Sequence, residues 1–171
     1  MALLEIVKYP DPVLDKPGEV VTEFDDKLKR LVEDMFATMY EARGVGLAAP
    51  QVGVSQRLFV MDCSFREEPE QRVALINPEI IHVEGEQLGD EGCLSFPDVY
   101  FAVKRELRAV ARAQDVNGEW FEFDGTELAA RCMLHETDHC DGIVFISHTT
   151  PLKRQMVKRK MKKLKNQSRW I

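Results

Sequence analysis

The chain of 171 residues lacks any long apolar run. Its first segment, MALLEIVKYPDP, has no basic stretch followed by about 7–15 apolar residues, so the sequence predicts neither a signal peptide nor a membrane contact. The four cysteines, at positions 63, 93, 132 and 140, form no close C-x-x-C pair. A disulfide framework is therefore not indicated, and a reducing, cytoplasmic location is expected.

Acidic residues are absent after Asp141, although the chain holds 29 of them against 23 basic residues. Residues 151–171 contain nine of the basic residues, so the preceding part, with 14 basic and 29 acidic residues, carries a net charge of −15. The basic segment predicts one of two structures. It is either a solvated helix with a thin apolar stripe on the body or a helix that docks on an anionic partner.

Hydrophobic spacing and turn signals predict the order helix, strands, helix, helix, and therefore an α+β fold in one domain over residues 1–171. The expected architecture is a set of antiparallel strands around a central helix, with a basic C-terminal helix at about 151–167 and an apolar stripe of Leu152, Met156, Met161 and Leu164. Asp25 or Asp26 is expected to cap the first helix, which should end near Gly44. An Asp124–Glu127 capping box and Gly142 should bound the central helix. The predicted strands are 57–63, 73–83, 107–115 and 119–124, the last two joined by a hairpin at Asn117-Gly118.

The central helix carries the pattern H-E-x-x-H in MLHETDHC, residues 133–140. His135 and His139 lie four positions apart, so both imidazoles project from one helix face and can share a divalent metal. Glu136 lies beside them and can reach a water on that metal. The pattern predicts a metal-dependent hydrolase whose third ligand is still to be found.

The third ligand is unlike that of two common metalloprotease classes. Phe145 stands where one class has a third histidine, and no glutamate follows Asp141 to serve as in the other. Cys132 to His139 spans a rise of about 10.5 Å, too long for all three residues of the helix to bind one ion. Cys93, in the turn-like sequence DEGCLSFP, is the favoured ligand, and Cys63 and His148 remain alternatives.

Three sequence blocks occur together: GVGLAAPQ (44–51), EGCLSFP (91–97) and HETDH (135–139). This set, together with IVKYPDPVL near the start, resembles the peptide deformylase family over nearly the whole chain. The resemblance implies a metal held by Cys93, His135 and His139. It implies Fe(II) as the natural ion, with zinc, nickel or cobalt in its place in isolated protein.

The resemblance also implies a reaction, the removal of the formyl group from the N-terminal formyl-methionine of nascent polypeptides, with release of formate. Glu136 would act as the base, while the Gln51 amide and the Leu94 backbone N–H would stabilise the oxyanion. Candidate substrate-binding residues are Val45, Leu128 and Cys132 as walls of a methionine slot, with Gly46 and Gly92 allowing close approach.

The sequence also leads to expectations for residues outside the predicted site and to two alternative functions. Glu91 is expected to have a structural role, paired with Arg105. Thr137 and Cys140 depart from the bulky apolar residue and the leucine that are usual in the family. The basic helix would contact ribosomal RNA, as in some bacterial deformylases. The alternatives are another H-E-x-x-H amidase or peptidase and a non-catalytic RNA-associated relative.

Overall fold

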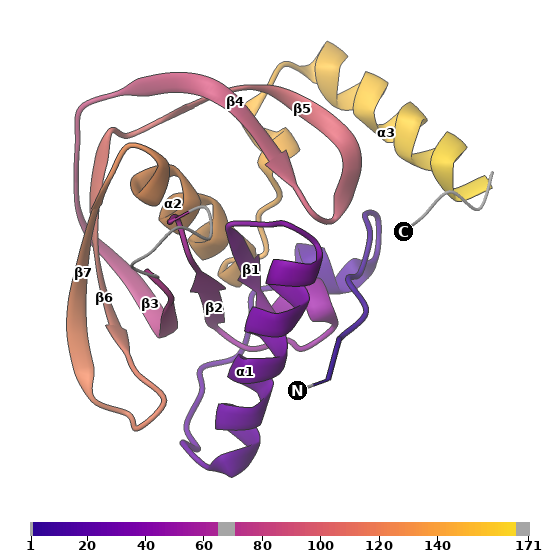
Figure 1. The fold of residues 1–171 in the computed structure, drawn as a ribbon. Helices are drawn as coiled ribbons and strands as arrows, with labels where there is room; N and C mark the ends of the chain where they lie inside the picture. The colour runs from indigo at the N-terminus through magenta and orange to yellow at the C-terminus, as the bar shows by residue number, and fades with distance from the viewer. Residues whose placement is uncertain (1, 65–70, 167–171) are drawn as a thin grey trace.

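The computed structural model describes residues 2–64 and 71–166, in which two antiparallel sheets surround one helix (Figure 1). The helices are α1 (Asp26–Glu41), α2 (Leu128–Cys140) and α3 (Pro151–Asn166), with short 3-10 turns η1 (Pro12–Asp15), η2 (Ala49–Val52) and η3 (Phe145–His148). The strands are β1 (Gly46–Ala48), β2 (Leu58–Met61), β3 (Val73–Glu84), β4 (Gln87–Cys93), β5 (Phe96–Arg105), β6 (Arg108–Gln114) and β7 (Trp120–Thr126). The predicted α+β fold is confirmed.

The larger sheet has the strand order β1-β2-β3-β6-β7, with every neighbouring pair antiparallel. The predicted hairpin between β6 and β7 is present, and Gly118 takes a positive φ of 83° in its turn. The second sheet is the hairpin β4–β5, which the sequence patterns above do not predict. A register shift between Gly92 and Cys93 ends its regular pairing and sets Cys93 opposite Phe96.

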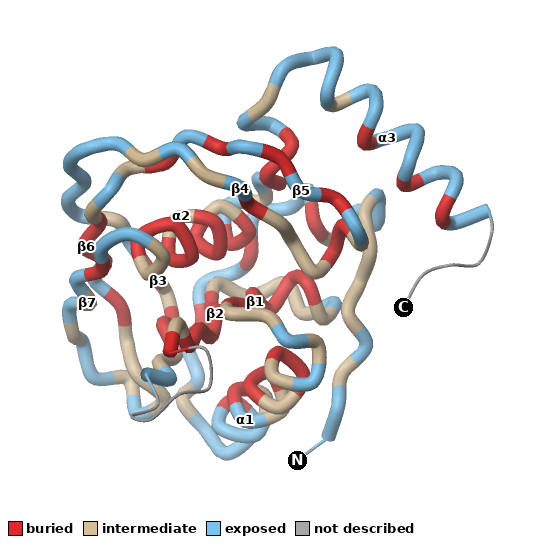
Figure 2. The backbone as a smooth tube through the Cα atoms, turned by 45° about the horizontal axis from the view of Figure 1, so that its top comes forward, coloured by how far each residue is buried: buried red, intermediate tan, exposed pale blue. Residues whose placement is uncertain are grey.

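Helix α2 is the centre of the molecule, and Figure 2 shows most of its length as buried. The predicted capping box at its start is wrong. Asp124 belongs to β7, where it pairs with β6 and forms an ion pair with Arg108. The helix begins at Leu128, after Glu127, whose φ of 55° turns the chain sharply out of the strand and whose side chain makes no cap. Continued strand pairing through Thr126 leaves no room for an earlier helix start.

The C-terminal end of α2 is held by segments from early in the chain. The Cys140 carbonyl accepts hydrogen bonds from the Gly18 backbone N–H at 2.9 Å and from Arg57 at 3.0 Å. Gly142 follows with a φ of 76°, and a Cβ there would lie 2.7 Å from the backbone of Lys16. The predicted end of the helix at Gly142 is thus confirmed, and the position requires glycine for two reasons.

Helix α1 lies beside β1 and β2, and its start agrees with the prediction, because the Asp25 carboxylate accepts from the Leu28 N–H at 3.0 Å. It ends at Glu41, slightly before the predicted Gly44, and Arg43 takes the left-handed conformation with a φ of 59°.

Helix α3 packs on the β5–η3 side of the molecule by a narrow face, visible in Figure 2 as single buried positions between exposed ones. Its buried residues are Val157, Met161 and Leu164. The predicted stripe is therefore only half right, since Leu152 and Met156 are exposed. No helix among the described residues is long and apolar enough to cross a membrane.

Candidate metal centre

Three potential metal ligands come together from two elements, the end of β4 and the C-terminal half of α2. The ligand atoms of Cys93, His135 and His139 all lie within 4.8 Å of one another. The Cys93 sulfur is 3.4 Å from His139 Nε2. A thiolate and two imidazoles at these separations fit one ion with nitrogen bonds of about 2.0–2.1 Å and a sulfur bond of about 2.3 Å. In residues 2–64 and 71–166, no other group of three metal-ligating side chains is this close.

His135 is oriented by a buried carboxylate. Its Nδ1 lies 2.7 Å from Glu91 Oε2, so Nδ1–H donates to the carboxylate and Nε2 is left for a metal. Arg105 binds Glu91 with two hydrogen bonds, of 3.0 and 2.7 Å, and Arg131 adds a third of 3.0 Å. Burial by itself would raise the pKa of Glu91, but the bonds from His135 and Arg105 hold it well below its usual range. The expected Glu91–Arg105 pair is confirmed, and it forms part of a larger network.

His139 and Glu136 are also buried, and burial changes the protonation of both. Removal from water, reinforced by the nearby charge of His135, lowers the pKa of His139 to about 3. The imidazole is therefore neutral, as metal binding requires. Burial raises the pKa of Glu136 to about 7, and its Oε1 has no hydrogen-bond partner in the part of the chain that is described. A carboxyl group in this state can both accept and donate a proton near neutral pH.

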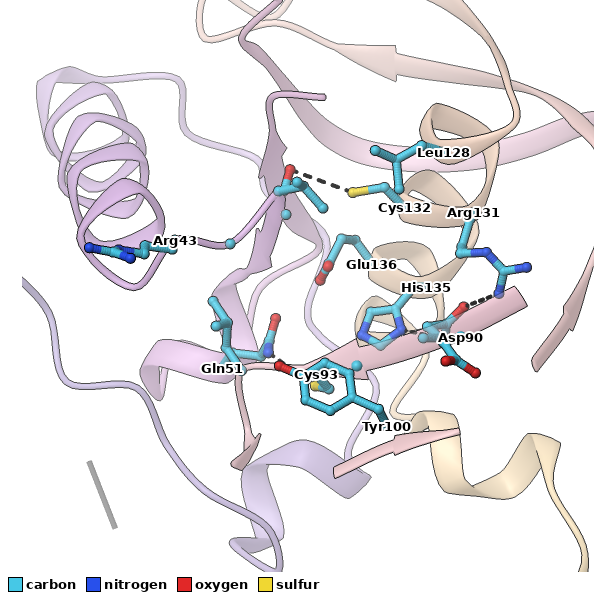
Figure 3. Close-up of a pocket in the computed structure, with 16 residues that line it drawn as sticks. Arg43, Gln51, Asp90, Cys93, Tyr100, Leu128, Arg131, Cys132, His135 and Glu136 are labelled. Atoms are coloured by element: carbon cyan, nitrogen blue, oxygen red, sulfur yellow. Dashed lines mark hydrogen bonds and ion pairs between the residues drawn. The ribbon is translucent and has the colours of Figure 1, made fainter. Parts of the chain in front are cut away.

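Gln51 approaches the same centre from η2. Its Oε1 accepts from the Ala48 N–H at 3.0 Å, which fixes the amide orientation. Its Nε2 then faces Cys93 Sγ at 3.4 Å and Ser95 Oγ at 3.3 Å. The side chain thus makes a backbone bond and still presents a donor to the ligand group (Figure 3).

A cavity of about 240 Å³ opens beside these residues. Figure 3 shows Gln51, Cys93, His135 and Glu136 grouped together, with Leu128 and Cys132 nearer the start of α2. Ten of the eleven predicted site residues line the cavity: Gln51, Cys93, Leu94, His135, Glu136, Val45, Gly46, Gly92, Leu128 and Cys132. The eleventh, His139, is 1% exposed and lies outside the lining, where it reaches the centre through its imidazole.

The two predicted glycines are needed because other side chains fill the space beside them. A Cβ on Gly46 would lie 2.6 Å from Cys132 Sγ and 2.7 Å from Glu136 Oε2. A Cβ on Gly92 would lie 2.4 Å from the Tyr100 ring. In this structure, the space that a larger residue would need at each glycine is therefore occupied by neighbouring side chains of the same protein.

Neither alternative third ligand joins the group. Cys63 is half-buried and packs against the core cluster that contains Cys132. His148 contacts Asp138 instead. The two family departures are also accommodated. The Thr137 hydroxyl donates to the Met133 carbonyl at 2.7 Å, and Cys140 is fully buried, which raises the pKa of its thiol to about 12.

Several residues at the site were not predicted from the sequence. Arg43, Gly44, Asp90 and Arg131 also line the cavity. The alternation of Val99, Phe101 and Val103, all buried in β5, is a strand signal that could have revealed the hairpin carrying Asp90 and facing Arg131. The glycine and the arginine at 43–44 give no such signal, because only the fold of the loop after α1 places them there.

Comparison with known proteins identifies the family to which this chain belongs. The family model for polypeptide deformylase matches residues 3–155. The chain belongs to the polypeptide deformylase family. The peptide deformylase of Acidobacterium capsulatum is 54% identical over 99% of this chain and 100% of its own length. That of Thermodesulfovibrio yellowstonii is 49% identical over 95% and 98%.

Solved structures of deformylases also have a fold similar to that of this chain. A peptide deformylase from Legionella pneumophila superimposes with a TM-score of 0.91 at 44% identity, covering 98% of each chain. The Thermotoga maritima deformylase gives a TM-score of 0.82 at 42% identity, covering 88% of this chain and 100% of its own. The chain is a metal-dependent hydrolase of the deformylase family, which removes the N-formyl group from nascent polypeptides.

Proposed function

We propose that Cys93, His135 and His139 bind the catalytic metal, with Fe(II) as the native ion and Zn(II), Ni(II) or Co(II) able to replace it. The observation that carries this proposal is the clustering of their ligand atoms within 4.8 Å. One soft thiolate and two imidazoles suit all four ions. A divalent ion bound there would lower the pKa of a water ligand and polarise a carbonyl oxygen.

The side chains around the ligands supply the remaining chemistry. Glu136 takes a proton from the attacking water as the water oxygen adds to the formyl carbon. Gln51 Nε2 and the Leu94 N–H donate hydrogen bonds to the oxygen of the former carbonyl, which carries the developing negative charge. Glu136 then gives the proton to the departing amine, and the carbon–nitrogen bond breaks to yield formate and a free N-terminal methionine. The Oε1 atom of Glu136, which is buried and has no hydrogen-bond partner among the described residues, supports this role.

The methionine side chain would lie against Val45, Leu128 and Cys132, which line one part of the cavity. Cys132 Sγ donates to the Val45 carbonyl at 3.6 Å, so these two residues of the lining are in contact. Leu128→Phe narrows this slot and should raise KM for formyl-Met peptides more than for formyl-Ala peptides. An equal change for both peptides would remove Leu128 from the slot.

The decisive experiment measures formate released from a formyl-Met tripeptide by protein purified without oxygen and loaded with Fe(II) or Ni(II). Glu136→Ala should lower kcat by about 10²–10⁴-fold, the usual contribution of general acid–base catalysis. Metal content should stay at one ion per chain. Glu33→Ala, which removes an exposed carboxylate from α1, is the matched control and should behave like the unmodified chain. Full activity in Glu136→Ala would contradict the assignment of the base.

The second part of the proposal concerns where the reaction takes place: in the cytoplasm, at the ribosome, through the basic helix α3. Eight lysine and arginine residues and no acidic residue lie within Pro151–Asn166, and the family match ends inside this helix at residue 155. The buried residues of this helix are Val157, Met161 and Leu164, and most of its lysine and arginine residues are exposed. Contacts to RNA phosphates would make binding strongly dependent on salt.

Charge reversal tests this contact without removing the helix. The double variant Lys158→Glu and Lys162→Glu should weaken ribosome co-sedimentation at low salt and flatten its salt dependence. Lys27→Glu with Arg30→Glu makes the same charge change on exposed positions of α1 and serves as the control. Equal binding by both double variants would reject the helix as the contact.

A further inference from the structure

His148, which does not join the three potential ligands, has a defined position near them. It ends η3, and its Nε2 lies 2.8 Å from Asp138 Oδ2. Arg105 Nη1 lies 2.8 Å from the same oxygen and 3.4 Å from the His148 nitrogen. Since a carboxylate only accepts hydrogen bonds, Nε2 of His148 carries a proton, and two donors share one Asp138 oxygen.

The contacts continue from Arg105 to a metal ligand. Arg105 Nη2 donates to Glu91 Oε2 at 2.7 Å, and the same Glu91 oxygen accepts from His135 Nδ1 at 2.7 Å. His148 is therefore linked to His135 through three intervening side chains: Asp138, Arg105 and Glu91. Arg105 and Glu91 are almost completely buried, whereas the Asp138 side chain is 21% exposed and the His148 side chain 35%.

The turn that carries His148 also touches His135 directly. Phe145, at the other end of η3, has its ring centre 5.7 Å from that of His135. Phe145 is 1% exposed and stacks on Phe101 at 4.6 Å, so η3 is firmly seated. His148 therefore donates from a fixed backbone.

We propose that His148 is a positioning residue for the metal centre, which holds Asp138 in place so that Arg105 keeps its two-bond contact with Glu91 and fixes the His135 ring. The proposal rests on the metal ligation proposed above. Asp138 is the most exposed of the three side chains that link His148 to His135. Without the His148 donor its side chain can turn to water, and Arg105 Nη1 then loses its acceptor. Any shift of Arg105 moves Glu91 and loosens the orientation of His135.

The test compares His148→Phe, which keeps the ring size but has no donor, with His148→Gln, whose amide can still donate to Asp138. His82→Phe is the matched control, since His82 is a half-exposed histidine on β3 that pairs with Glu84. The readouts are the Kd for Co(II), the visible absorption of the Co(II) protein, and kcat and KM for a formyl-Met peptide at saturating metal. Melting of the metal-free protein reports folding.

His148→Phe should raise the Kd for Co(II) about 3- to 10-fold, less than the roughly 10- to 100-fold expected for direct partners of a metal ligand. It should also shift the Co(II) bands and lower kcat with KM unchanged, while His148→Gln and His82→Phe match the unmodified chain. Identical Co(II) binding and spectra in all variants would overturn the proposal. Equal losses in His148→Phe and His148→Gln would do the same, because the donor would then be irrelevant. Absence of a thiolate–Co(II) band in the unmodified chain would overturn the proposed ligation itself, and this proposal with it.

Discussion

The polar network behind His135 and the C-terminal helix α3 differ in what attaches them to the rest of the chain. The network joins charged side chains from β4, β5 and α2, nearly all of them buried. Helix α3 is attached mainly through the apolar side chains of Val157, Met161 and Leu164, with one hydrogen bond from Lys160 to the Asp98 carbonyl, and most of its charged residues are exposed. In the first region every group depends on its partners, because a buried charge without a partner is costly. In the second, each contact contributes separately.

The largest effect should follow from Glu91→Ala in the network. The change leaves the charges of Arg105 and Arg131 and the His135 ring without their common acceptor. Breaking a buried ion pair from one side typically costs about 3–5 kcal/mol, and we expect a loss of that order in the free energy of unfolding. Urea denaturation of the metal-free protein measures it, and metal analysis should show reduced occupancy. Glu33→Ala, in an exposed pair with Arg72, should change neither quantity measurably. A small effect at Glu91 would mean that the two regions do not differ in this way.

An intermediate effect, on catalysis more than on stability, is expected for Gly46→Ala. The new methyl group would meet Cys132 Sγ and Glu136 Oε2 at 2.6 and 2.7 Å, so the carboxylate must move. A displacement of about 1 Å in a catalytic group can cost on the order of 10²-fold in rate. Steady-state formate release should show this loss mainly in kcat. Gly89→Ala is the control, because its methyl group would lie at an ordinary 3.5 Å from Arg131. Similar kinetics for the two variants would contradict the role of Gly46.

The smallest effect is expected in α3, from Met161→Ala. Met161 is 1% exposed, and truncation of a buried methionine costs about 2 kcal/mol at the low end of the usual range. The loss should appear in local hydrogen exchange of α3, with kcat and KM for a short formyl peptide unchanged. Met156→Ala, at an exposed position of the same helix, is the control. Reduced activity in Met161→Ala would show that the two regions are coupled after all.

The central part of the site could be predicted because it is local in sequence. The spacing of His135, Glu136 and His139 places them on one helix face whatever the rest of the fold. The third ligand could not be chosen from the residues alone, since Cys93, Cys63 and His148 each remained open. Only the three blocks shared with the deformylase family singled out Cys93. Its position depends on the β4–β5 hairpin, where buried Glu91 and Arg105 occupy positions that an apolar pattern would have marked.

Other errors have similar physical causes. Asp124 and Glu127 have the residue types and the spacing of a capping box. The chain instead stays paired with β6 as strand β7 through Thr126, so no helix can begin there. The predicted apolar stripe on α3 is partly wrong because the helix packs on the rest of the protein by a narrow face. That face contains Val157 and not Met156. The network of Asp138, Arg105 and His148 has no sequence signature, since Arg105 lies 33 and 43 residues from the other two.

The anchoring of α2 at Cys140 has a consequence for synthesis of the chain itself. The helix that carries two of the proposed metal ligands ends on the Gly18 N–H and the Arg57 side chain, and Glu91 and Arg105 contact its His135 and Asp138 side chains. Such long-range contacts cannot form until the last of their members has left the ribosome. A translating chain therefore cannot complete these contacts until about residue 140 has emerged, long after the segments with Gly18 and Arg57.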